Sequence, residues 1–130
     1  MGIVYTDLRL GNLAHPELEE INVTALVDTG ALHLCIPEHV ATQLRLTPLQ
    51  QREVRTADGK SHIVDYVGPI RISLLGRDCV TGALVLGDKP LLGAIPMEDM
   101  DLIVDPARQK LSVNPDNPNL PLSLAMGVRK

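Results

Sequence analysis

Ala25-Leu26-Val27-Asp28-Thr29-Gly30-Ala31 is the most informative segment of the chain. An apolar segment typical of a strand ends abruptly in an acid, a hydroxyl and a glycine. A strand that ends in this way fixes the position of a carboxylate, and the glycine lets the backbone turn so that its amide faces that carboxylate. The same residues also fit a plain junction in which Asp28 only forms the turn. The rest of the chain decides between these interpretations.

Length and composition restrict the classes of protein to consider. The chain has 130 residues and a hydrophobic content of 45%, which suits one folded domain with a single core. No apolar run approaches the roughly 18 residues that span a membrane. No charged segment followed by a long apolar one marks a secretion signal. We therefore expect a cytoplasmic protein without a membrane partner.

Charge and aromatic content argue against nucleic acid as a partner. The net charge is −4 at pH 7 and no basic cluster is present. Tyr5 and Tyr66 are the only aromatic residues among Phe, Trp and Tyr, so base-stacking platforms cannot be built. The core must therefore consist of Leu, Val, Ile and Ala.

The cysteines and histidines predict no metal site and no cofactor. Cys35 and Cys79 lack the paired spacing of metal ligands, and His33 and His39 flank Cys35 without a second cluster. We expect the cysteines to be small buried hydrophobic residues in a reducing compartment. A disulfide or a reactive thiol is the alternative.

The pattern along the chain is mostly of period two, broken by turn residues, and predicts strands. An Asp-Gly pair within Ala57, Asp58, Gly59 and Lys60 predicts the turn of a long hairpin. The strands expected are residues 3–10, 20–27, 32–36, the hairpin arms between about 50 and 75, 80–86, 102–104 and 110–113. Short helices are expected from Pro37 to about Leu44 and from Pro96 to Met100. We therefore predict a mostly β fold, a small closed and mostly antiparallel barrel with one or two short helices.

Three features in this order resemble the retropepsins, the family of single-domain aspartic proteases. They are residues 26–31, the glycine-bearing hairpin at Asp58 and Gly59, and the apolar pair Leu91 and Leu92 followed by Gly93 before a short helix. The resemblance covers about residues 3–113, and it is nearest to bacterial-type members outside the retroviruses. It implies a retropepsin-like domain over residues 1–113 and a C-terminal extension over residues 114–130.

The resemblance implies an aspartic endopeptidase with Asp28 as its catalytic residue. Two carboxylates a few ångströms apart share a proton, so one takes a proton from water while the other gives one to the carbonyl. The nearest second candidate loop, residues 79–83, has Val80 where the acid should be. The active site would therefore be built across a homodimer from two copies of Asp28. A peptide or protein would be the substrate.

Supporting roles follow from the same resemblance. The Thr29 hydroxyl would contact the partner loop, and the Gly30 amide would bind the Asp28 carboxylate. Ala31 cannot donate a hydrogen bond to that carboxylate, which predicts a mildly acidic to near-neutral activity optimum. The hairpin at residues 57–60 would be a flap over an extended peptide, bound as an added strand. An ordinary solvated hairpin is the alternative.

The chain also departs from the retroviral pattern. An acid after the D-T-G-A sequence and an arginine after the apolar-apolar-glycine usually pair, but Leu32 and Ala94 stand there. Because the acid and the arginine are both absent, no unpaired charge is buried, but the dimer must be held in another way. Alternating leucines at residues 120–125 predict an interface strand, with residues 1–5 as a candidate partner strand. A flexible tail is the alternative.

Two other functions remain open at this point. One is a catalytically silent module of retropepsin fold that only dimerises or binds peptides, because fold does not prove activity. The other is a monomeric β-barrel in which Asp28 serves the turn. His33 follows the Asp28 loop closely enough to contact substrate, and an ordinary histidine at the surface or core edge is the alternative.

Overall fold

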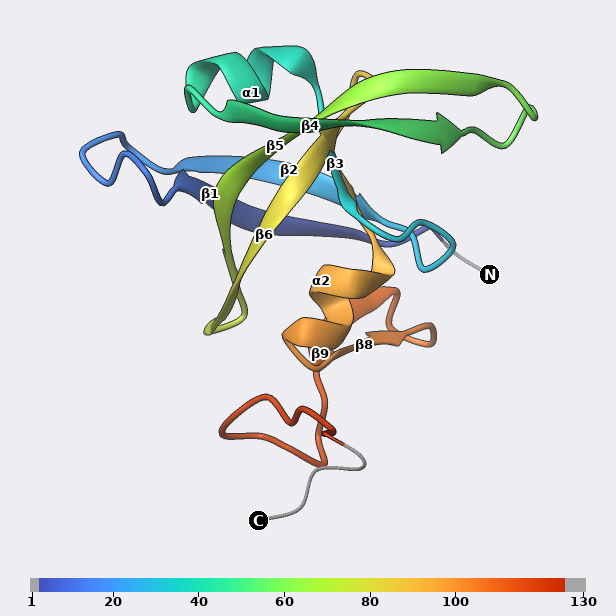
Figure 1. Cartoon of the computed structure of the whole chain (residues 1–130). Helices are drawn as coiled ribbons and strands as arrows, with labels where there is room; N and C mark the ends of the chain where they lie inside the picture. The colour runs from blue at the N-terminus through green and yellow to red at the C-terminus, as the bar shows by residue number, and fades with distance from the viewer. Residues whose placement is uncertain (1–2, 126–130) are drawn as a thin grey trace.

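Six strands close into a barrel in the computed structural model, which describes residues 3–125 (Figure 1). The sheet order is β1-β2-β7-β3-β6-β5-β4, and β1 also pairs with β5, which closes the ring and leaves β4 outside it. The strands are β1 (Tyr5–Asn12), β2 (Ile21–Val27), β3 (Leu34–Ile36), β4 (Thr47–Arg55), β5 (Ser61–Leu74), β6 (Arg77–Val85), β7 (Leu91–Leu92), β8 (Leu102–Asp105) and β9 (Lys110–Val113). The helices are α1 (Glu38–Gln43) and α2 (Ala94–Asp99).

Most strand pairs are antiparallel, as the sequence predicts. The parallel pairs are β2 with β7 and β3 with β6, where short central strands arrive after crossovers. A separate two-stranded sheet contains β8 and β9. The prediction of a mostly β, closed and mostly antiparallel barrel with two short helices is confirmed.

The long strand β5 belongs to two parts of the molecule. Its first half pairs with β4 in a ladder from Thr47↔Gly68 to Arg55↔Ser61, and its second half pairs with β1. Pro69 lies where the pairing with β6 shifts register, because proline has no N–H for the ladder. The β4–β5 arm, defined here as β4, β5 up to Gly68 and the turn between them, therefore extends beyond the barrel (Figure 1).

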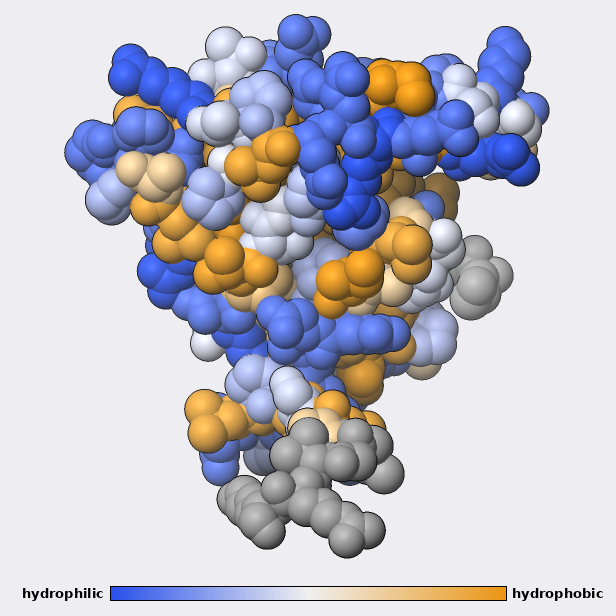
Figure 2. Space-filling model, in the orientation of Figure 1, coloured by the Kyte–Doolittle hydropathy of each residue, from blue (hydrophilic) through white to orange (hydrophobic). Residues whose placement is uncertain are grey.

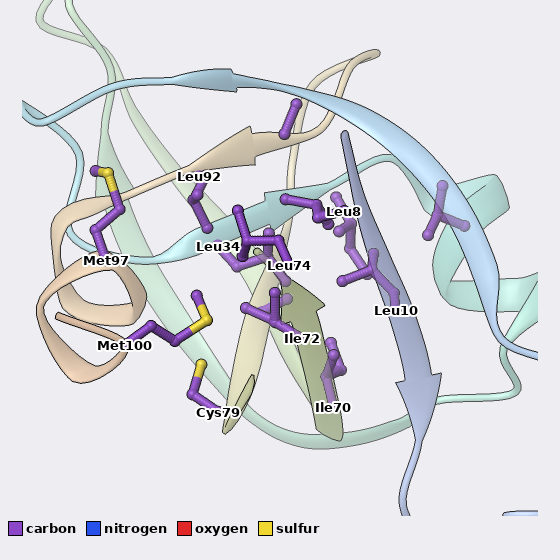
Figure 3. Packing of buried hydrophobic residues seen from close by; sticks show 14 of the residues in the cluster. Leu8, Leu10, Leu34, Ile70, Ile72, Leu74, Cys79, Leu92, Met97 and Met100 are labelled. Atoms are coloured by element: carbon purple, nitrogen blue, oxygen red, sulfur yellow. The ribbon is translucent and has the colours of Figure 1, made fainter. Parts of the chain in front are cut away.

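The core is aliphatic, as the near absence of aromatic residues predicts. Along β5, Ile70, Ile72 and Leu74 point inward in strand alternation, and Leu10 of β1 and Leu34 of β3 are fully buried with them. Sulfur-containing side chains from α2 and β6 fill one end of the core (Figure 3). Each large aliphatic side chain contributes about 1.5–3 kcal/mol by burial, which replaces what aromatic residues supply in other cores.

Some element ends differ from the prediction because of tertiary contacts. Strand β1 continues to Asn12, which was expected in a loop, because Asn12 pairs with Ile70 of β5. Its buried side chain donates to the carbonyl of Leu44 at 2.8 Å and so satisfies the end of α1. At the other end of α1, Pro37 is an extended N-cap residue and the helix begins at Glu38.

The C-terminal extension forms no strand among residues 114–125, so the strand predicted at residues 120–125 is absent from the single chain. Leu120, Leu122 and Leu124 are exposed there. Among residues 3–5 no pairing with it is formed either, and Tyr5 pairs with Leu26 of β2. Residues 1–2 and 126–130, which these predictions include, lie outside the described part.

The extension is nevertheless tethered to the domain as far as Leu122. The Asp101 carboxylate accepts hydrogen bonds from the Asn117 side chain at 2.8 Å and from the Leu122 amide at 3.0 Å. These contacts hold the pKa of Asp101 below its usual value, with the Leu122 amide as the largest cause. The buried Arg77 donates to the carbonyl of Asn117 as well. The role of the extension in a dimer stays a prediction.

Candidate active site

Strand β2 delivers Asp28 to a half-buried position at the edge of the barrel. Val27 is paired in register with Leu92 of β7, and the Asp28 amide donates to the Leu92 carbonyl at 3.0 Å. The position of Asp28 is therefore fixed from two sides, by its own strand and by β7. The sequence motifs at residues 26–31 and 91–93 are brought together in this way.

The loop that follows, residues 28–33 and called the Asp28 loop from here on, turns back on the Asp28 carboxylate. The Gly30 amide donates to Asp28 Oδ1 at 2.9 Å, which is the contact expected from the sequence. The Ala31 amide donates to the Asp28 carbonyl at 3.2 Å and closes the turn. Thr29 is exposed. Its role toward a partner loop stays a prediction.

The start of α2 clamps the same loop. The Ala94 amide donates to the Ala31 carbonyl at 2.8 Å, and the Ile95 amide donates to the Leu32 carbonyl at 2.9 Å. These bonds explain why α2 begins at Ala94 and not at Pro96. The two positions that lack the acid–arginine pair, Leu32 and Ala94, thus lie at a backbone junction.

Gly93 is required by a close approach of two backbone segments. A Cβ atom at this position would lie 2.4 Å from the carbonyl oxygen and 2.7 Å from the nitrogen of His33. Distances this short do not occur between real Cβ atoms and backbone. The glycine after Leu91 and Leu92 is therefore part of how the Asp28 loop is held.

The turn of the β4–β5 arm is built by its own residues. The Asp58 carboxylate accepts from the Thr56 hydroxyl at 2.5 Å and from the Lys60 amide at 3.0 Å. These contacts, the hydroxyl first, lower the pKa of Asp58. Gly59 has a φ of 83°, which favours glycine in this turn. Ala57 and Lys60 complete the hairpin, which is confirmed as a structural element; its role as a flap stays a prediction.

Sequence reasoning missed the contact between the arm and the Asp28 loop. Arg52 of β4 donates from Nη1 to His33 Nε2 at 3.2 Å. The guanidinium also lies over the ring of Tyr66, 4.3 Å from its centroid, and the rings of His33 and Tyr66 meet edge to face. Burial, followed by the charge of Arg52, lowers the pKa of His33. His33, Arg52 and Tyr66 are far apart in sequence and follow no motif, so the sequence carries no signal of their contact.

The cysteines take no part in this arrangement as nucleophiles. Cys35 and Cys79 are free and buried, as predicted for small hydrophobic residues. Burial and the nearby Asp28 carboxylate raise the pKa of Cys35. Burial raises the pKa of Cys79 to about 12. Thiols of this kind are mostly protonated at neutral pH and react slowly.

Asp28 is half-buried, and it does not line the cavity that the described residues form beside β1. A cavity of about 500 Å³ lies between β1 and the β5–β6 turn, with Arg9, Ser73 and Arg77 among its lining residues, and does not include Asp28. The arm projects as a mostly hydrophilic lobe with hydrophobic residues below its base (Figure 2). Within residues 3–125, no cluster of His, Cys, Asp and Glu could hold a metal ion. No helix in the described part is long and apolar enough to cross a membrane.

Comparison with known proteins finds a family match over the part of the chain that contains Asp28. The family model described as gag-polyprotein putative aspartyl protease matches residues 15–94. EIAV protease complexed with the inhibitor HBY-793 is similar in structure, with a TM-score of 0.56 and 18% identity over 75% of this chain and 88% of that chain. The retroviral protease-like domain of Ddi1 from Leishmania major gives a TM-score of 0.59 and 15% identity over 98% and 99%. No curated protein matches the sequence. At these identities the solved structures show the fold alone.

Proposed function

The chain belongs to the gag-polyprotein putative aspartyl protease family, and from this premise we propose that it is an aspartic endopeptidase active as a homodimer. The observation that carries the proposal is the Asp28 carboxylate at the end of β2, oriented by the Gly30 amide at 2.9 Å. A domain that served only as a scaffold would have no need of a carboxylate held in this way at the end of a strand.

The chemistry requires two such carboxylates. In aspartic proteases, two acids too close to ionise together share one proton. The ionised Asp28 takes a proton from water as the water oxygen bonds to the scissile carbonyl carbon, and the protonated Asp28 gives its proton to the carbonyl oxygen. The acid that took the proton from water then gives it to the leaving nitrogen as the C–N bond breaks. One hydroxyl of the diol returns its proton to the other Asp28, which restores the pair with one shared proton. No cofactor or metal takes part in this scheme.

One carboxylate per chain makes the homodimer a requirement of this mechanism. The nearest comparable stretch, residues 79–83, lies within strand β6 and has an exposed Val80 where an acid would be needed. A twofold axis beside the Asp28 loop would bring together two copies of Asp28. Thr29 of each copy would brace the partner loop, because it is exposed next to Asp28.

The remaining finer assignments are part of the same proposal. Residues 1–113 form the protease domain, and residues 114–130 contribute to the dimer, because exposed Leu120, Leu122 and Leu124 are available to a second chain. The residues of the arm turn, 57–60, close over an extended peptide held by its backbone. The protein acts in the cytoplasm.

Cleavage of a diverse peptide mixture between pH 4 and 8 tests the proposal. We expect wild-type protein to produce cleavage that Asp28→Asn lowers by at least about 10³-fold, because the general acid–base group is lost. Asp88→Asn, which makes the same chemical change at an exposed site before β7, serves as the matched control and should keep full activity.

The oligomeric state separates the proposal from its alternatives. Light scattering should give a dimer for wild type and for Asp28→Asn. Peptide binding by a dimer that cleaves nothing at high concentration would favour a catalytically silent module instead. A strict monomer without cleavage would contradict both of these functions.

A further inference from the structure

The face of the β4–β5 arm that looks toward the Asp28 loop carries one arginine. Along β4, Arg52 and Val54 are half-buried, whereas Gln51, Glu53 and Arg55 are exposed, so the first pair lies on the inner face. Tyr66 pairs with Gln50 in the ladder. The hydrogen bond from Arg52 to His33, five positions after Asp28, shows that this inner face meets the Asp28 loop.

All partners of Arg52 within the described residues are neutral. They are His33 Nε2, the ring of Tyr66 and, with the amide oriented to accept, the oxygen of Gln50, at 2.8 Å from Nη2 and 3.1 Å from Nε. Arg71 and Arg108, in contrast, pair with Asp78 and Asp105. Among residues 3–125 no carboxylate lies within ion-pair distance of Arg52, so its positive charge is not compensated.

The contact with His33 preserves that charge and orients it. A guanidinium has only donors, so His33 Nε2 must accept, which places the ring proton on Nδ1 and makes His33 neutral. Tyr66 is fixed in turn, because its hydroxyl accepts from the Gly82 amide at 3.2 Å. Three of the five N–H groups of Arg52 are engaged in this way. One N–H on each terminal nitrogen remains, and N–H groups on both terminal nitrogens can bind a carboxylate in bidentate fashion.

We propose that Arg52 is a specificity-determining residue that binds the carboxylate of an Asp or Glu side chain in a peptide held between the β4–β5 arm and the Asp28 loop. The inference rests on the proposed peptide cleft and names its preferred substrate class, peptides with an acidic residue close to the scissile bond. A bidentate, partly desolvated Arg–carboxylate contact of this kind raises the preference for Glu over Gln by about tenfold or more.

Matched peptides and arm variants test the proposal. Once an Asp28-dependent cleavage site is found, peptides carrying Glu, Gln or Lys at each position around it are compared by kcat/KM. Wild type should prefer Glu over Gln by about tenfold or more at one position. Arg52→Gln should abolish the preference, and Arg52→Glu should shift it to Lys. The control Arg55→Glu makes the same charge change on the outer face and should keep the wild-type preference.

A binding measurement separates this inference from the proposed function. Anisotropy of the labelled Glu and Gln peptides with Asp28→Asn should show the same preference, which Arg52→Gln removes in that background. Active wild type without any acidic preference overturns the inference and leaves the protease standing. Arg52-dependent binding without cleavage overturns the protease and supports the inference.

The same series of variants tests whether Arg52 has only a structural role. Arg52→Lys keeps the charge without the bidentate geometry, so it should retain part of the preference. If Arg52→Gln and Arg52→Lys lose activity equally on Glu and Gln peptides, Arg52 only braces the arm and the inference is overturned.

Discussion

The Asp28 loop and the β4–β5 arm are built in opposite ways. Backbone hydrogen bonds from β7 and α2 hold the loop, and Gly93 packs so closely against His33 that no side chain fits. The arm is a two-stranded ladder whose turn has open space around Gly59. Side-chain contacts from Arg52, midway along β4, join the two regions.

The proposed function requires one rigid region, which holds the carboxylate, and one movable region, which covers the peptide. A reacting carboxylate must be held in one position by rigid elements. A cover over a peptide must open and close, which is easier for a segment with few buried contacts. The variants below test how far the two regions differ.

The largest expected effect lies in the loop. Gly93→Ala should lower the free energy of unfolding by about 3 kcal/mol or more, because its Cβ would meet backbone atoms that cannot move aside. Urea denaturation measures the loss. A change below about 0.5 kcal/mol would show that the backbone segments do not approach so closely.

A glycine in the arm should matter less to stability. Gly59→Ala should cost roughly 1 kcal/mol, because the residue has a φ of 83° but nothing lies within 4 Å of the added methyl group. Gly59→Asn, which adopts this conformation more readily, should cost less. Equal losses for Gly93→Ala and Gly59→Ala, again by urea denaturation, would contradict the contrast between loop and arm.

The smallest effect is expected where the regions meet, and it depends on pH. The folded protein has a lowered pKa at His33, so the unfolded chain binds more protons as the pH falls below about 6.5. The stability due to neutral His33 is therefore present above that pH and is lost as the pH falls through the folded pKa. His33→Gln should flatten the stability profile between pH 7 and 5, whereas His39→Gln, at an exposed position, should leave the slope attributed to His33 unchanged.

The lowered pKa of His33 supports the pH dependence of activity predicted from Ala31. Protonated His33 can no longer accept the hydrogen bond from Arg52, so the contact between the arm and the Asp28 loop should loosen in acid. Cleavage by wild type should therefore be greatest from mildly acidic to near-neutral pH. A maximum near pH 3 in the peptide assay would contradict this prediction.

Much of the fold could be predicted because its signals are local. Alternation of apolar residues indicates the strands, and Asp58-Gly59 indicates the turn of the arm, since both depend on neighbours along the chain. The ends of elements were less predictable. Asn12 joins a strand through β5, and α2 begins early because its first amides find carbonyls in the Asp28 loop.

Local sequence is enough to show that an acid follows an apolar strand, that a glycine follows it two positions later, and that Leu91-Leu92-Gly93 precedes a helix. The folded chain was needed to show that Gly93 lies against His33, that Arg52 reaches His33, and that Asp101 tethers the C-terminal extension. The two sets differ in how far apart the interacting residues lie along the chain. Turn formation and strand alternation are set by adjacent residues, whereas these contacts exist only after the barrel has closed and brought distant segments together.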